Sequence, residues 1–200
     1  MTASEAASGI RRTWREAPPA VRAVVAGMLV NRLGGFLQVF LALFLVHNGF
    51  GTVRAGIALG AYATGSVLGV LVGGWLVARI GVRLSIVSSM TATAVLTAAL
   101  LYASPYPLIL VLATAVGATS QVYRPASGEL VGRLTPEGRQ VMVFAMYRLA
   151  TNVGATVAPL LGAALLTGSY GFLFWSEAAA ALGCALIGAF ALPHDRPARE

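Results

Sequence analysis

Two ionisable side chains lie inside long apolar stretches of this 200-residue chain, where a charge is costly and marks a candidate functional site. Arg32 lies near the middle of the first stretch, roughly 15 Å from its start at about 1.5 Å per helical residue. Glu177 is the only acidic residue within any of these stretches. Arginine keeps its proton, so Arg32 is suited to binding an anionic group or holding a carboxylate partner. Glu177 can take up and release a proton, as proton coupling requires.

Each of these residues also has a plainer interpretation. Arg32 can extend to the lipid headgroups or bond to helix carbonyls, and Glu177 lies close enough to the end of its stretch to reach the membrane interface. Arg124 and Arg148 lie nearer the ends of their stretches, and both are suited to reaching the headgroups. Arg148 and Asn152 share a helix face at i,i+4, which also allows a simple packing pair.

The composition places these residues in a membrane. Apolar residues make up 58% of the chain, charged residues only 10%, and the mean hydropathy is +0.79. A soluble domain carries about a quarter charged residues. The net charge of +7 does not indicate nucleic acid, because the arginines lie between apolar stretches rather than on one soluble face. The single cysteine, Cys184, lies in an apolar run, so we expect neither a disulfide framework, a metal centre nor a cofactor.

Six apolar stretches are long enough to cross the bilayer as helices, since a crossing needs about 20 residues. The predicted spans are 22–46, 55–77, 84–103, 107–123, 141–166 and 172–192. The sequence therefore predicts an all-α membrane protein. It divides the chain into a tail at 1–21, a six-helix bundle at 22–193 and a tail at 194–200. The longest predicted internal loop is 124–140, between spans four and five.

The distribution of arginine predicts how the spans are oriented. With the N-terminus inside, one set of segments holds ten arginines and the other holds only Arg54. Cytoplasmic loops are enriched in arginine and lysine, so both termini are expected in the cytoplasm and the protein in the inner membrane. An enzyme is not expected: His47 and His194 both lie at membrane edges, which leaves no buried Ser–His pair for an intramembrane protease.

A shift of about 89 residues superimposes the first three spans on the last three. Ladders of small residues match at this offset, with Ala61, Gly65, Gly69 and Gly73 opposite Ala150, Gly154, Ala158 and Gly162. The same shift pairs Asn31 and Arg32 with Ser120 and Gln121. Because three is odd, two such triplets lie in opposite orientations, as in the inverted repeats of secondary transporters.

Two segments resemble signatures of the major facilitator superfamily. Residues 74–83, GWLVARIGVR, resemble its loop signature Gly-x-Leu-small-Asp-Arg-x-Gly-Arg-Lys/Arg. The matching residues are Gly74, Leu76, Arg79, Gly81 and Arg83. Ala78 and Val82 depart from it.

Residues 154–163, GATVAPLLGA, resemble the antiporter signature through Gly154, Pro159 and Gly162, with alanines at two glycine positions. Residues 31–36 look like those of drug-efflux members, but Ala113 replaces the arginine usual early in span four.

The resemblance covers the N-terminal half of a twelve-span fold. In that fold the first helix of each triplet lines a central cavity, which implies a substrate site at Asn31, Arg32, Gln38, Ser120, Gln121 and Arg124. It also implies that Arg79 and Arg83 brace neighbouring helices, through Glu129 or Glu137, in one state of the transporter. Pro159 is expected to bend span five. A coupling carboxylate is expected either at Glu177 or in a second half.

The sequence thus predicts a secondary transporter, or half of one, that exports small organic molecules by alternating access with proton coupling. The alternative is a truncated or accessory membrane module that does not itself transport. Spans two and five face the other half in the resembled fold. Their ladders are therefore expected to pack against a second six-span bundle, either another copy or a separate chain.

Overall fold

The protein is described by a computed structural model that covers residues 14–166 and 169–192, without the side chain of residue 137. Most of the two predicted tails lies outside the described residues. The described part contains helices and no strand. Six segments are long and apolar enough to cross a membrane, which confirms the predicted spans. They are Pro19–His47, Gly51–Ile80, Val82–Leu101, Tyr106–Leu134, Gln140–Leu166 and Tyr170–Ala191.

Span one consists of two helices, α2 (Pro19–Leu33) and α3 (Leu37–His47). The break falls at Gly34-Gly35. A Cβ at Gly34 would collide with the Cβ of Ala180 in α9 (Tyr170–Ala191), so the break packs directly against span six. Pro19, the first residue of α2, causes no conflict there, because the first helical N–H groups lack partners in any case.

Span four is also interrupted, between α6 (Tyr106–Gln121) and α7 (Tyr123–Leu134). Pro125 provides the reason, since a proline cannot donate to the carbonyl four residues earlier, here that of Gln121. The predicted loop at 124–140 is therefore wrong in most of its length. The chain continues as helix to Leu134, and a short 3-10 turn at Glu137–Arg139 leads into α8 (Gln140–Leu166).

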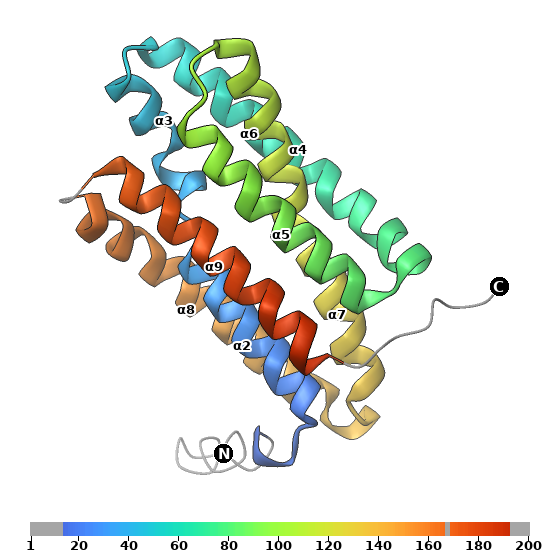
Figure 1. Ribbon diagram of the computed structural model, residues 1–200. Helices are drawn as coiled ribbons and strands as arrows, with labels where there is room; N and C mark the ends of the chain where they lie inside the picture. The colour runs from blue at the N-terminus through green and yellow to red at the C-terminus, as the bar shows by residue number, and fades with distance from the viewer. Residues whose placement is uncertain (1–13, 167–168, 193–200) are drawn as a thin grey trace.

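The helices pair as an inverted repeat requires. Span one packs against span five (α2 with α8), and span four packs against span two, α4 (Gly51–Ile80). If span one is exchanged with span four and span two with span five, the contact between spans one and five becomes the contact between spans four and two. Span three, α5 (Val82–Leu101), packs against span six, its own counterpart in the exchange. Figure 1 shows α4, α5 and α6 along one side of the bundle and α2, α8 and α9 along the other.

The small-residue ladders pack inside the chain. Gly65 and Gly69 lie so close to α6 that an added Cβ would collide with the backbone of Thr114 or Ala118. Gly154 and Gly162 of α8 lie in the same way against the side chains of Arg32 and Phe40. The expectation that the ladders face a second bundle is therefore wrong: they join the two repeats to each other, as close backbone approach between helices permits.

Candidate functional site

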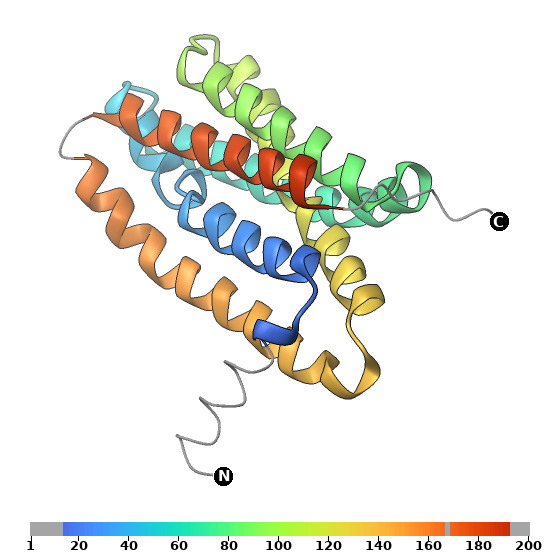
Figure 2. The ribbon, with the colours of Figure 1, turned by 60° about the horizontal axis from the view of Figure 1, so that its bottom comes forward.

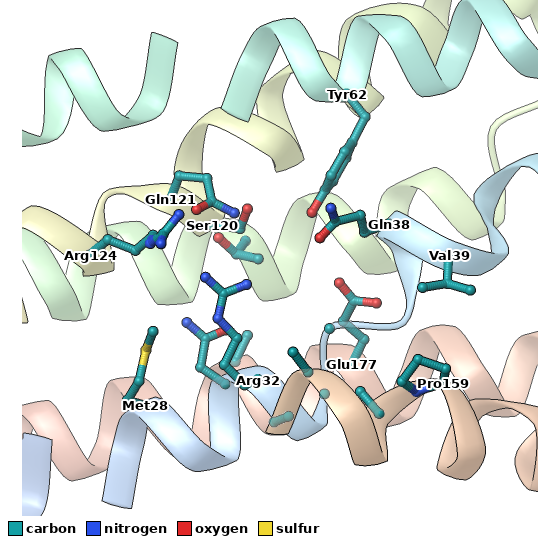
Figure 3. Close-up of a pocket in the computed structure, with 18 residues that line it drawn as sticks. Met28, Arg32, Gln38, Val39, Tyr62, Ser120, Gln121, Arg124, Pro159 and Glu177 are labelled. Carbon is teal, nitrogen blue, oxygen red and sulfur yellow. The ribbon is translucent and has the colours of Figure 1, made fainter. Parts of the chain in front are cut away.

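A polar cavity of about 240 Å³ lies at the centre of the bundle, beside the two helix breaks (Figure 3). All six residues predicted for the substrate site line it: Asn31, Arg32, Gln38, Ser120, Gln121 and Arg124. A neighbouring cavity shares Arg32, Gln38, Gln121 and Arg124 with it and opens along α4. The structure thus gathers residues that lie as much as 93 positions apart, as Arg124 lies from Asn31.

The two breaks occupy corresponding positions of the repeat. The helix α2 ends at Leu33 and α6 ends at Gln121, and an offset of about 89 residues aligns these two ends within one position. Arg32 therefore lies in the last turn before one break, and Gln121 is the last residue before the other. Paired interruptions of membrane helices place polar groups at mid-membrane depth in secondary transporters, since backbone that leaves the helix must line a cavity or pack against protein.

Arg32 projects into the cavity from α2, and Arg124 projects into it from the first turn of α7 (Figure 3). The Nε atom of Arg32 is buried and has no hydrogen-bond partner among the described residues. The two guanidinium groups are close enough for their positive charges to repel each other. Neither forms an ion pair with any carboxylate that the structure describes. The cavity lining therefore holds two arginines that are not ion-paired within the described part of the chain.

Glu177 reaches the cavity from α9, opposite the arginines (Figure 3). Only 6% of the residue is exposed, and its Oε2 accepts a hydrogen bond of 2.6 Å from the backbone N–H of Leu37. Leu37 is the first residue of α3, so the carboxylate satisfies a backbone donor that the break in span one leaves free. The interpretation that Glu177 reaches the membrane interface is wrong.

Tyr62 of α4 is a lining residue that the sequence interpretation missed. Its ring is 6% exposed, and its hydroxyl points into the cavity next to Gln38 (Figure 3). It lies one position after Ala61, in the ladder helix, where an aromatic residue with a polar tip gives no signal of its own. Met28, Val39 and Pro159 add apolar surface to the same cavity.

The antiporter-like segment supports this site through packing. Gly154 lies against Arg32, Pro159 lines the cavity, and Gly162 lies against Phe40. Pro159 lies inside α8, which continues through it. By contrast, Arg148 and Asn152 are exposed and do not line the cavity.

The motif loop lies at one end of the bundle. Gly81 joins α4 to α5 with φ at +83°, a conformation that favours glycine, and Gly74 is exposed. Arg83 donates a hydrogen bond to the carbonyl of Ala189 in the last turn of α9, and Arg79 lies over the ring of Trp75. Glu129, one of the two expected partners, pairs with Arg133 instead, and the side chain of Glu137 lies outside the described part.

A helical membrane bundle of two inverted triplets, with a polar cavity at paired helix breaks, has the architecture of half a secondary transporter. The Major Facilitator Superfamily profile matches residues 24–200, and the chain belongs to that family. It is 33% identical over 163 residues to YttB, an uncharacterized MFS-type transporter of Bacillus subtilis (strain 168), covering 80% of this chain and 41% of YttB. It is 24% identical to YqjV of the same strain, covering 76% of this chain and 37% of YqjV.

Solved structures show the same fold. A peptide transporter POT mutant in complex with sulfate matches with a TM-score of 0.76 and 16% identity, over 90% of this chain and 40% of the transporter. Tetrameric PepTSo2 matches with a TM-score of 0.68 and 22% identity, over 86% of this chain and 39% of PepTSo2. The chain therefore spans about two fifths of the relatives that it matches.

Proposed function

We propose that this chain forms half of a secondary transporter that exports small organic molecules by alternating access. The central cavity supports this proposal: a set of polar side chains meets at two corresponding helix breaks, with apolar residues between them. Pockets for small molecules combine mostly apolar walls with a few placed polar groups, as this cavity does. Arg32, Gln38 and Arg124 are the proposed contacts to the polar part of the substrate.

The proposed switch between access states uses the contacts at the motif loop. Arg83 ties the start of α5 to the last turn of α9, and this bond would break if the two helices shifted against each other. Arg79 lies on the other side of Gly81, in the last turn of α4, where it is exposed and available for a contact with a second bundle.

Transport can be tested without knowledge of the substrate. The chain is expressed in an efflux-deficient bacterial strain, and the cellular content of a panel of small organic compounds is measured by mass spectrometry. We expect at least one compound to accumulate less than in cells without the chain, and Arg32→Ala to remove the difference at equal expression. Arg148→Ala, at an exposed position outside the cavity, serves as the control and should keep it. If no compound changes, the alternative function, an accessory module that does not transport, is favoured.

Proton coupling is the second part of the proposal, with Glu177 as its carboxylate. Glu177 lines the cavity and also bonds to the first residue of α3, so a change in its charge acts on the break in span one. A proton taken up by Glu177 weakens this hydrogen bond, because a neutral acid accepts less strongly than a carboxylate. Proton binding and the angle between α2 and α3 are thereby linked through one contact.

The orientation in the inner membrane is proposed from the arginine distribution, with both termini in the cytoplasm. A reporter that is active only in the periplasm should give no signal when fused after residue 200. The same reporter inserted at Ser104, between spans three and four, should be active. Activity at the C-terminus would contradict the proposed orientation.

A second six-span bundle is the proposed partner, either another copy of this chain or a separate polypeptide. Spans two and five contribute the most exposed helices: 28% and 17% of their apolar windows are buried, against 44% for spans three and six. The exposed faces of α4 and α8 border the cavity, so a second bundle placed there would close it.

Cysteine cross-linking tests this contact. In a Cys184→Ala background, Val67→Cys on α4 and Ala155→Cys on α8 should form inter-chain disulfides in the membrane upon mild oxidation. Both positions line the cavity region, and both are exposed. Val95→Cys on α5 is the matched control, because Val95 and Val67 are both 63% exposed. Equal cross-linking at Val95 would indicate random collision rather than assembly.

A further inference from the structure

The central cavity is lined by two arginines and one carboxylate, Glu177, and neither arginine forms an ion pair within the described part of the chain. Arginine stays protonated, so it cannot relieve the cost of burial by losing its charge. The guanidinium groups of Arg32 and Arg124 also repel each other across the cavity. Arg32 is partly buried, so its unpaired charge is costly there unless an anion lies beside it, whereas Arg124 is exposed within the chain.

None of the carboxylates that the structure describes forms an ion pair with Arg32 or Arg124. Glu177 accepts a hydrogen bond from the backbone of Leu37, Glu129 pairs with Arg133, and Glu16 pairs with Arg139. The contacts within the described bundle give Arg32 no carboxylate to anchor, and its place in the cavity lining leaves it available to an anionic ligand. The Nε of Arg32 is buried without a partner among the described residues, as expected for a donor that awaits a ligand.

From this arrangement we infer that Arg32 and Arg124 form an anion-binding site for the acidic group of the substrate. The substrate class is a small organic anion, with a carboxylate, sulfonate or phosphate group on an apolar body. The acidic group lies between the two guanidinium groups, which bind oxyanions through paired N–H donors. The apolar body lies against Met28, Val39 and Pro159, which line the same cavity. This inference rests on the proposed transport function, and names the ligand class of its site.

Binding by the purified chain tests the inference separately from transport. The probes are benzoate, benzamide and benzylamine, which share one apolar ring and differ in charge. Binding is measured by saturation-transfer NMR and by the shift of the thermal unfolding midpoint, at constant ionic strength. We expect benzoate to bind and the other two to bind at least about tenfold more weakly, as the loss of a charge-assisted hydrogen bond predicts. If benzamide binds as tightly as benzoate, the inference is overturned, and this result needs no variant.

Variants then locate the site. Arg32→Gln and Arg124→Gln should each weaken benzoate binding about tenfold or more, by the same reasoning. Arg148→Gln, at an exposed arginine outside the cavity, should leave it unchanged. Arg124 is exposed within the chain, so its substitution leaves the helix packing intact even if Arg32→Gln impairs folding. Full benzoate affinity in Arg124→Gln would overturn the two-arginine site.

An anionic lipid headgroup offers the same chemistry as a soluble anion. Benzoate affinity is therefore compared in nanodiscs of phosphatidylcholine and of phosphatidylglycerol. A substrate site predicts the same affinity in both, whereas a loss of about tenfold or more in phosphatidylglycerol would assign the site to lipid and overturn the substrate class. Benzoate binding by a chain that exports no compound would keep the anion site and refute the transport function, so the two failures can be told apart.

Discussion

Gly69→Leu is expected to prevent the bundle from folding. An added Cβ at Gly69 would collide with the backbone carbonyl group and Cα of Ala118 in α6, and a backbone segment inside a helix cannot move away as a side chain can. Overpacking of a well-packed interior costs about 1–3 kcal/mol and sometimes more. Here the collision lies in the contact between spans two and four, so the cost falls on the packing of one repeat against the other.

The control is Gly60→Leu on the same helix, where an added Cβ meets nothing within 4 Å. Both variants gain the same side chain, and both replace a helical glycine by a residue of higher helix propensity. The measurement is the fraction of monodisperse protein after detergent extraction, followed by the free energy of unfolding in mixed micelles. We expect Gly60→Leu to resemble the unmodified chain. If Gly69→Leu does so as well, the close α4–α6 contact is not formed.

Glu177 has two proposed roles, one in the stability of the bundle and one in proton coupling. Two substitutions distinguish these roles. Glu177→Gln keeps a carbonyl oxygen that can accept from the backbone N–H of Leu37, but it cannot exchange a proton. Glu177→Leu removes the acceptor as well and leaves a buried N–H unsatisfied, at a cost of about 1–3 kcal/mol. We therefore expect Glu177→Leu to lower the free energy of unfolding markedly and Glu177→Gln to lower it little.

Transport gives the second measurement on the same pair of variants. In proteoliposomes, a pH gradient should drive the compound identified by the export screen through the unmodified protein. Glu177→Gln should abolish this driven accumulation while exchange without a gradient continues. Glu129→Gln is the control, because Glu129 is an exposed acid that pairs with Arg133 on α7. Gradient-driven accumulation by Glu177→Gln would place the coupling carboxylate elsewhere, such as in a second half.

The fold class and six of the residues that line the cavity were predictable from the sequence, whereas Tyr62 was not. Membrane spans can be recognised by their length and apolarity, because a bilayer requires about 20 apolar residues per crossing. The shared offset of the ladders and of the polar pairs indicated the inverted repeat, and the motif segments indicated the family. The six predicted cavity residues line the cavity, since they lie on the first helix of each repeat and next to its break. Their part in binding a substrate stays a prediction.

Both helix breaks have local signals in the sequence, which a prediction from hydropathy does not use. Gly34-Gly35 in span one and Pro125 in span four both disrupt helical hydrogen bonding, and they fall near corresponding positions of the repeat. Hydropathy does not register them, because an interrupted span is as apolar as a continuous one. The segment at 124–134 was predicted as loop for the related reason that its polar residues resemble a connection, whereas it forms α7.

The partners of each buried group were decided by tertiary structure alone. Glycine ladders show that helices approach closely, but the pattern is the same whether the neighbour belongs to the chain or to another bundle. Here the neighbours are α6 for α4 and span one for α8. The position of Glu177 followed from the break in span one, which lies 140 residues away from it and exposes the N–H of Leu37. A sequence specifies which groups need a partner, but only the packing of distant helices determines which partner each one meets.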